Sequence, residues 1–253
     1  MLLIILLLNR HPLWKLFKAA MMVSVIIPTL NEEENIEGVL KRTNSILDAI
    51  DGIDYEILIV DDCSCDNTVC VAERAVGKNG RVIKRDVGKK SLSLSVVHGI
   101  KQSKGEAIIV MDGDGSHPPD ILPYFIENLK SGYDLIVASR YIKGGSTENF
   151  SLSRKFISRS ACFLGSVLTD IQDNTSGFFC VRKCALEGVN LTPIGFKIGL
   201  EVFVKGRFNS YKEIPYTFLH RQKGISKLKS SRITQYLNHF FKLLVYKFSR
   251  KEK

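Results

Sequence analysis

The most informative stretch of the chain is AIIVMDGDGSH, residues 107–117. Its first five residues are apolar and partly β-branched, which is typical of a strand buried on both faces of a sheet. The apolar run ends at Asp112 and Asp114, which are separated by Gly113, so two carboxylates would lie at the end of that strand. Such a pair can hold a hard divalent cation such as Mg²⁺ together with substrate phosphates. A solvated turn of Asp and Gly residues is the alternative, and this stretch alone does not decide between the two.

The segments around this stretch predict strands that alternate with helices. We expect strands at residues 23–29, 55–60, 81–84, 107–111 and 135–139. Helices are expected after Asn31 as a cap, from the turn at 63–68 through residue 75, at 92–103 and at 118–129. This alternation predicts an α/β fold with a mostly parallel central sheet and flanking helices. A dinucleotide-binding fold is disfavoured, because no GxGxxG motif follows the first strand.

Three of the expected strands end in polar residues. They are Pro28 with Asn31 and Glu32, Asp61 with Asp62, and Asp112 with Asp114. Ligands of open α/β sheets bind where the carboxyl ends of the strands meet. We therefore expect the functional site at this edge of the sheet.

The second half of the sequence is less regular. We expect a helix at 151–168, a loop at 173–177 and a strand at 178–182. Residues 211–216 are expected to form an edge strand, because Pro215 cannot donate to a strand ladder. A basic loop at 220–229 precedes a tail whose apolar residues recur at helical spacing among lysines and arginines. The tail is therefore expected to form a basic amphipathic helix.

Composition limits the classes of partner. The chain has 253 residues and a net charge of +10, and its pI is near 9.3. This charge suggests a polyanionic partner: a nucleic acid, an anionic lipid or a phosphorylated substrate. The six cysteines show no paired CxxC spacing, which favours reduced thiols in a cytosolic protein. The opening MLLIILLL is too short to span a membrane, and we expect either an interfacial anchor or an upstream extension.

Five motifs in order resemble a known family. They are Ile27-Pro28-Thr29-Leu30-Asn31-Glu32, Val60-Asp61-Asp62-Cys63-Ser64, Met111-Asp112-Gly113-Asp114, Ser139-Arg140-Tyr141 with Gly144-Gly145, and Thr175-Ser176-Gly177-Phe178. Together they resemble family 2 GT-A glycosyltransferases of the dolichyl-phosphate mannosyltransferase type, from about residue 22 to residue 228. The basic segment 221–228, RQKGISKL, resembles the group with polyprenyl phosphate acceptors. The resemblance implies a GT-A fold: one Rossmann-like domain at 22–229, after an apolar extension at 1–21 and before a basic amphipathic tail at 230–253.

The resemblance also implies a reaction. A sugar, mannose from GDP-mannose, would be transferred with inversion to dolichyl or polyprenyl phosphate, with Mg²⁺ or Mn²⁺ as cofactor. Because a lipid phosphate is already an anion, the acceptor needs cations that hold it in line rather than a separate base. UDP-glucose is the alternative donor.

The resemblance assigns roles to individual residues. Asp114 and Arg140 are the catalytic candidates. Metal ligands would be Asp112, Asp114 and Ser116, the last standing where some relatives carry a metal-binding Gln. The donor nucleotide would be bound by Pro28, Thr29, Asn31, Glu32, Asp61, Asp62, Asp112, Gly113, Lys197, Arg221 and Lys227. The acceptor phosphate would be bound by Arg140, Arg154 and Ser158. Asp173 and Ser176 either border the acceptor pocket or form a plain turn, and His117 is expected to be structural.

The sequence is also compatible with functions other than catalysis. A non-catalytic basic module for RNA or anionic membranes would also suit the charge. The aromatic residues, however, do not form stacking platforms beside basic runs, so no nucleic-acid partner is expected. A lipid acceptor implies a peripheral protein at the cytoplasmic face of a membrane. The tail would either dock on that membrane or pack on the domain's own core or on a membrane-anchoring partner subunit.

Overall fold

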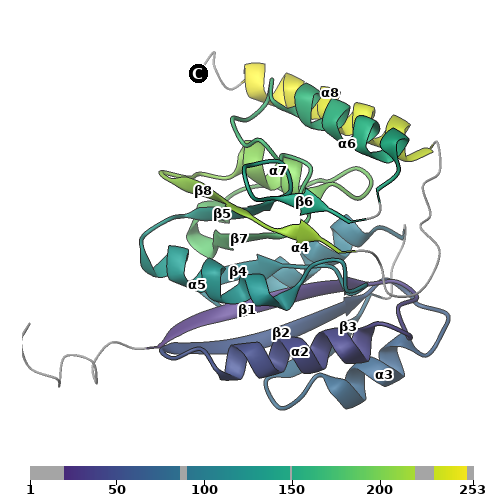
Figure 1. Cartoon of the computed structure of the whole chain (residues 1–253), viewed down its shortest axis with the longest axis vertical. Coiled ribbons are helices and arrows are strands. Elements are labelled where there is room, and N and C mark those ends of the chain that lie inside the picture. Colours follow the sequence, from purple (N-terminus) through teal and green to yellow (C-terminus); the bar gives the residue numbers. More distant parts are fainter. Residues whose placement is uncertain (1–19, 86–89, 149, 220–230, 250–253) are drawn as a thin grey trace, which may run out of the picture.

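A mostly parallel sheet forms the centre of the molecule. The computed structural model describes residues 20–85, 90–148, 150–219 and 231–249. Within these ranges seven strands make up the central sheet, in the order β3-β2-β1-β4-β7-β5-β8 (Figure 1). Their bounds are β1 Met21–Thr29, β2 Ile53–Asp61, β3 Gly80–Lys84, β4 Ala107–Val110, β5 Leu135–Ser139, β7 Phe179–Arg182 and β8 Tyr211–Pro215. The α/β fold and the edge position of β8 are confirmed.

One strand of the central sheet departs from the parallel pattern. β7 runs antiparallel to both of its neighbours, β4 and β5, whereas the other neighbouring pairs are parallel. A separate two-stranded ribbon pairs β6, Ser146–Thr147, with β9, Thr217–Phe218. This ribbon brings the segment after β5 next to the segment after β8.

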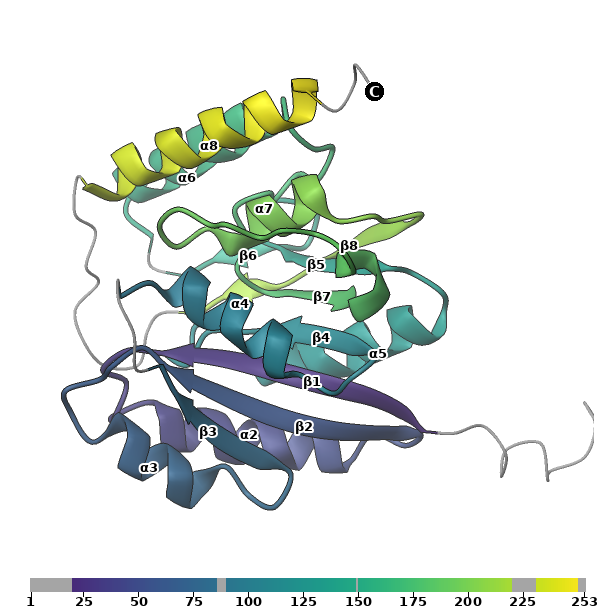
Figure 2. The same ribbon diagram turned by 180° about the vertical axis from the view of Figure 1, so that it is seen from behind.

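Helices cover both faces of the sheet (Figure 2). One face carries α2 (Ile36–Asp48), α3 (Thr68–Ala75), the short helix η2 (Pro119–Ile121) and α5 (Leu122–Lys130). The other face carries α4 (Leu92–Gln102), η3 (Lys183–Leu186) and α7 (Ile198–Lys205). Each face of the sheet therefore has its own apolar core. Because successive side chains of a strand point to opposite faces, Ile27 packs in the first core, under α2 and α5, and Ile26 packs in the second, under α4 and α7.

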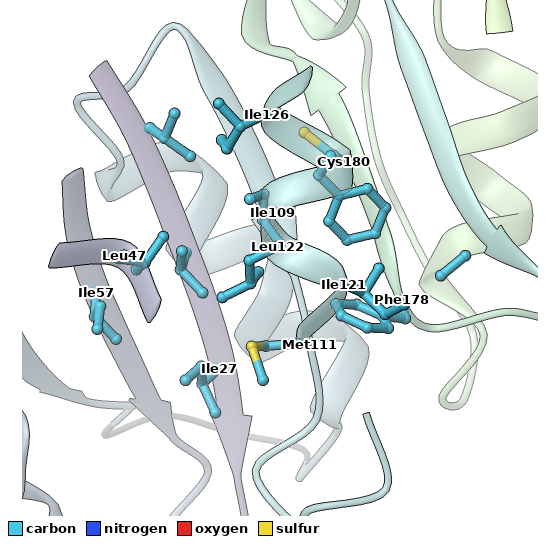
Figure 3. Close-up of a cluster of buried hydrophobic side chains, with 14 of the residues drawn as sticks. Ile27, Leu47, Ile57, Ile109, Met111, Ile121, Leu122, Ile126, Phe178 and Cys180 are labelled. Atoms are coloured by element: carbon cyan, nitrogen blue, oxygen red, sulfur yellow. The ribbon is translucent and has the colours of Figure 1, made fainter. Parts of the chain in front are cut away.

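The first core fixes α2 and α5 on the sheet. Figure 3 shows Leu47 of α2 and Leu122 and Ile126 of α5 packed with Ile27, Ile57 and Ile109 from the strands. These side chains are buried almost completely. Burial on both sides of the sheet explains the continuous apolar runs that precede Asp61 and Asp112 in the sequence.

The loop after β1 differs from the sequence expectation. Asn31 does not cap a helix; it adopts a left-handed conformation with φ of 56°, which Asn tolerates better than most residues. Helix α2 begins only at Ile36. The intervening residues form a loop at the carboxyl end of β1, where they are available to the site.

Two helices form an outer layer at the end of the molecule away from β3 (Figures 1 and 2). They are α6 (Leu152–Gly165) and α8 (Ser231–Ser249), so the tail forms the helix that its spacing predicts. On α8, Tyr236, Phe240 and Leu243 are buried against Leu168 and Leu200. One face of the tail helix therefore packs on the domain itself. No helix within the described ranges is both long enough and apolar enough to cross a bilayer.

A buried charge cluster fixes α8 further. Glu201 of α7 accepts a hydrogen bond from Lys205, and one of its oxygens lies 3.2 Å from Nε2 of His239 on α8. Burial raises the pKa of Glu201, but its hydrogen bonds with His239 and Lys205 outweigh burial and lower that pKa to about 2. The charged carboxylate is therefore part of the folded state at neutral pH.

Packing of α8 predicts unequal effects of two substitutions on the same helix. Leu243→Ala leaves a cavity at a fully buried position and should lower the free energy of unfolding by about 2–5 kcal/mol. Val245→Ala is the matched control, because its side chain is 69% exposed, and should change stability by less than about 0.5 kcal/mol. Urea denaturation of the full chain measures both values. Equal, small effects would show that α8 does not pack on the domain.

Candidate active site

The register of β1 brings the ends of three strands together. Thr29 pairs with Asp61 of β2, and Ile26 pairs with Val110 of β4. The pairing continues beyond the ladders: Asp62 N donates to Thr29 O at 2.9 Å, and Met111 N donates to Ile26 O at 3.1 Å. The polar residues after β1, β2 and β4 therefore share one edge of the sheet.

The loops after β1 and β2 are bound to each other. Asn31 N donates to Ser64 Oγ at 2.9 Å, and Cys65 N donates to Asn31 Oδ1 at the same distance. Glu32 N donates to Thr68 Oγ1 at 2.7 Å. These bonds cross between the loops, so the backbone near Pro28 and Thr29 is held in a defined shape beside the edge.

Asp61 and Asp62 are both buried at this edge and have different partners. The carboxylate of Asp61 accepts hydrogen bonds from Ser64 N at 2.8 Å and from Thr29 Oγ1 at 3.1 Å. Asp62 Oδ1 accepts from Arg85 at 2.8 Å, whereas Oδ2 has no hydrogen-bond partner among the described residues. The ion pair with Arg85 was not expected from the sequence, because Arg85 follows β3 without any recognisable motif.

Asp112 and Asp114 follow β4, and both are partly exposed. The side chain of Asp112 is 42% exposed. Asp114 Oδ1 accepts hydrogen bonds from Ser116 N at 3.0 Å and from Ser116 Oγ at 2.6 Å. A Cβ on Gly113 would lie 3.1 Å from Thr29 Cγ2, so a larger residue there would require the Thr29 side chain to shift by a few tenths of an ångström. In this structure the Ser116 hydroxyl orients the Asp114 carboxylate.

His117 is buried next to Asp112 and accepts a hydrogen bond from its backbone N–H. Its ring is 2% exposed and stacks on Phe178 with a centroid distance of 4.8 Å. Nδ1 accepts a hydrogen bond from Asp112 N at 2.9 Å, so the neutral ring carries its proton on Nε2, 3.7 Å from Asp112 Oδ2. Burial lowers the pKa of His117 to about 3; Asp114 opposes this shift, and Arg140 and Lys197 add to it. His117 is therefore neutral at physiological pH.

A buried ion pair adjoins these carboxylates. Arg140, after β5, donates to both carboxylate oxygens of Asp173, with Nε–Oδ2 at 2.7 Å and Nη2–Oδ1 at 2.6 Å. It also donates to Thr175 Oγ1 at 2.9 Å. Burial opposes both charges, but these bonds outweigh it: they raise the pKa of Arg140 above its usual value and lower that of Asp173.

Lys197 approaches the same place from the start of α7. Its Nζ donates to Thr175 O at 2.6 Å. Burial and the neighbouring charge of Arg140 lower the pKa of Lys197 to about 8, while Asp173 and Asp112 act in the opposite direction. Lys197 and Arg140 thus bring two positive charges near Asp112 and Asp114.

The first turns of α6 extend the site along the sheet edge. Tyr141 Oη donates to Ser158 Oγ at 2.7 Å. The guanidinium of Arg154 lies 3.9 Å from the ring centroid of Phe150 and 5.9 Å from that of Phe218. Arg154 and Ser158 therefore lie on the side of α6 that faces the domain.

The structure brings most of the expected residues to one edge. Pro28, Thr29, Asn31, Glu32, Asp61, Asp62, Asp112, Gly113, Asp114, Ser116, Arg140, Ser158 and Lys197 lie on or next to the carboxyl ends of the strands or on the adjoining start of α6. Arg221 and Lys227 lie outside the described residues. The positioning roles of Thr175 and Tyr141 were missed, although both stand inside motifs quoted above.

Residues 24–189 match the family whose description is Glycosyl transferase family 2. The chain belongs to this family. Its α/β sheet with flanking helices is the fold of GT-A glycosyltransferases.

Three curated relatives share the name dolichol-phosphate mannosyltransferase. The protein from Pyrococcus furiosus is 43% identical over 88% of this chain and 64% of its own length. Those from Saccharomyces cerevisiae and Mycosarcoma maydis are 34% and 33% identical, each over 89% of this chain, and over 88% and 80% of their own lengths. The chain thus spans about two thirds of the length of the Pyrococcus relative.

Solved structures support the fold. Glucosyl-3-phosphoglycerate synthase from Mycobacterium tuberculosis, in complex with phosphoglyceric acid, superimposes with a TM-score of 0.66 at 18% identity. The match covers 91% of this chain and 81% of that protein. A complex of the same enzyme with Mn²⁺, UDP and glucosyl-3-phosphoglycerate gives a TM-score of 0.65 at 20% identity.

Burial of a neutral His117 predicts a pH effect on stability. Its pKa rises from about 3 when folded to about 6.5 when unfolded. The unfolded chain then binds the extra proton, so stability falls as the pH drops below 6.5. Between pH 7 and pH 5 in EDTA, the wild type should lose about 2 kcal/mol more than His117→Gln. Urea denaturation at each pH gives the two slopes, and parallel slopes would contradict a neutral, buried His117.

Proposed function

We propose that this protein is an inverting glycosyltransferase that transfers mannose from GDP-mannose to dolichyl or polyprenyl phosphate with the help of Mg²⁺ or Mn²⁺. The observation that carries the proposal is the pair of partly exposed carboxylates of Asp112 and Asp114 at the carboxyl end of β4. Two cations, Lys197 and Arg140, lie close enough for their charges to act on the same group of residues. The two carboxylates can hold a divalent ion, and the two cations can pair with the phosphates of a diphosphate bound to that ion.

The residues present fit a divalent ion. Within the described ranges there is no group of three or more His, Cys, Asp and Glu side chains that could enclose a metal by themselves. Asp112 and Asp114 would supply two oxygens, and the donor diphosphate would supply others, as is usual for Mg²⁺. When bound, the ion neutralises the charge that develops on the leaving diphosphate. Ser116 orients Asp114 by donating its hydroxyl proton, and the lone pairs of its oxygen stay available to the ion.

The chain's own groups bind and orient both substrates. A phosphate oxygen of the acceptor forms the new bond to the anomeric carbon, and the bond to the nucleoside diphosphate breaks on the opposite side. The acceptor phosphate is already ionised, so no side chain has to remove a proton. Arg140, Arg154 and Ser158 would hold the acceptor phosphate, and Lys197 would contact donor phosphates. Neutral His117 holds Asp112 in place.

The donor nucleotide would lie over the loops after β1 and β2. Pro28, Thr29, Asn31 and Glu32 offer backbone and side-chain groups there, and Asp61 and Asp62 offer carboxylates beside them. We further propose that Arg221 and Lys227 bind the donor nucleotide. We place the reaction at the cytoplasmic face of a membrane, with a membrane-anchoring partner subunit as a further component. The three relatives called dolichol-phosphate mannosyltransferase support the choice of sugar and acceptor.

Asp114→Asn tests the proposed reaction. The substitution keeps the shape of the side chain but removes its charge, and it should reduce transfer about 100-fold or more while the melting temperature stays near wild type. Asp120→Asn is the matched control, since Asp120 is an exposed carboxylate that pairs with Arg42, and it should retain full activity. The assay offers radiolabelled GDP-mannose and UDP-glucose in parallel, with polyprenyl phosphate as acceptor.

Three outcomes would count against parts of this proposal. Near-normal turnover of Asp114→Asn would exclude its catalytic role. Turnover that EDTA does not change would exclude the metal. Transfer from UDP-glucose in preference to GDP-mannose would replace the donor and leave the reaction class intact.

A further inference from the structure

Ser91 stands at the start of α4, in a position where a serine usually caps the helix. In that role the side-chain oxygen accepts a hydrogen bond from a backbone N–H of the first turn. The Ser91 side chain makes no such bond. Its hydroxyl instead donates to Gly195 O at 2.8 Å, and this partner is 104 residues further along the chain. The hydroxyl therefore connects two distant segments and does not cap its own helix.

Gly195 belongs to the loop that leads into α7. Its φ of 76° lies in the left-handed region that favours glycine, and a Cβ there would lie only 2.9 Å from Gln235 Oε1 of α8. Gly195 is thus held between α8 on one side and Ser91 on the other. Lys197, which donates to Thr175 O, follows two residues later. The Ser91 hydroxyl therefore holds the backbone directly before Lys197.

The backbone of Ser91 is bound to the loop after β2 through Arg85. Ser91 O accepts a hydrogen bond from Arg85 Nη1 at 3.1 Å, and the same nitrogen donates to Asp62 Oδ1 at 2.8 Å. The side chains of Arg85 and Asp62 are 9% and 2% exposed, so water competes little for these bonds. Arg85 is also tied to β2, because its backbone N donates to Asp61 O at 2.9 Å.

These contacts form one continuous link along the edge of the sheet. α4 and α7 pack in the same core on one face of the sheet, and the link joins them where both helices begin (Figure 2). The link, which we call the Ser91 link, consists of Asp62, Arg85, Ser91 and Gly195. Through it, the carboxylate after β2 and the segment that carries Lys197 have a fixed relative position.

We propose that Ser91 is a positioning residue that fixes the Lys197 ammonium group relative to Asp62. Under the proposed function, Asp62 lies beside the donor nucleotide and Lys197 beside the donor phosphates, so the link sets the spacing of two contacts to one ligand. A side chain that is in place before the ligand arrives loses less entropy on binding. Only this consequence for the donor rests on the proposed function, because the link consists of the chain's own hydrogen bonds.

Amine labelling of the full chain tests the link without any substrate. Ser91→Ala removes the bond to Gly195 O, and acetic anhydride should then acetylate Lys197 about fivefold faster, the factor that one neutral hydrogen bond is worth. Ser91→Thr keeps a hydroxyl and should restore the wild-type rate. Ser103→Ala is the matched control, since Ser103 Oγ donates to Ile100 O at 2.7 Å at the other end of α4, and it should leave labelling of Lys197 unchanged. Mass spectrometry of the Lys197 peptide measures the rates.

Calorimetric titration of GDP-mannose with Mn²⁺ tests the consequence for the donor. Ser91→Ala should weaken binding about fivefold, and Ser103→Ala should bind like wild type. In a Lys197→Met background, Ser91→Ala should cause no further loss, because the effect acts through Lys197. In the transfer assay the same variant should raise KM for the donor about fivefold and leave kcat within about twofold of wild type.

The outcomes separate this inference from the proposed function. Wild-type labelling of Lys197 in Ser91→Ala would overturn the link. Faster labelling with unchanged donor affinity would overturn the positioning role, as would an equal loss of affinity in Ser103→Ala or an undiminished loss in the Lys197→Met background. A wild type that binds neither GDP-mannose nor UDP-glucose would contradict the proposed function, whereas the labelling rates would still decide the link.

Discussion

The site depends on the parallel pairing of β1 with two neighbours at once. β1 lies between β2 and β4, and its register sets Thr29 opposite Asp61 and Ile26 opposite Val110. Because side chains alternate between the faces of a sheet, a shift of one residue would move Ile26 and Ile27 into each other's cores. The two apolar cores therefore hold the register, and the register holds Asp61 and Asp112 at one edge.

The positions of Arg140 and Lys197 depend on a second constraint, which is the burial of the Asp173 carboxylate. This carboxylate has no exposed surface, so its charge is stable in the fold only with a partner, and Arg140 supplies a two-point contact. The same turn contributes Thr175, whose carbonyl oxygen accepts from Lys197. The ion pair holds Arg140 and the adjoining turn holds Lys197, so two positive charges lie near Asp112 and Asp114. Long side chains held in this way lose little further entropy when they bind a phosphate.

The sequence predicted the strands that end in carboxylates because an apolar run followed by Asp can be read locally. The direction of β7 could not be read in this way: residues 179–181 are buried on both faces, and such a run looks the same in a parallel or an antiparallel strand. Partners distant in the chain were also hidden. Asp173 and Arg140 are 33 residues apart, and no periodicity connects them.

The tail shows a further limit of prediction from sequence. Its helical spacing is evident, and membrane docking and packing on the core are two alternatives for one apolar stripe. The structure shows that α8 has apolar residues enough for both: Tyr236, Phe240 and Leu243 face the domain, while Phe241 and Val245 face solvent. Only the position of α6 and α7 reveals which residues are covered, and that position is set by the rest of the fold.

Metal-dependent binding of the donor is the most direct measurement of the central claim that Asp112 and Asp114 hold a divalent ion and, through it, a nucleotide diphosphate sugar. Calorimetric titration of GDP-mannose into the full chain should show saturable binding with Mn²⁺. It should show at least about tenfold weaker binding in EDTA, and an equal loss in Asp112→Asn with Mn²⁺ present. The same affinity in all three conditions would contradict the account.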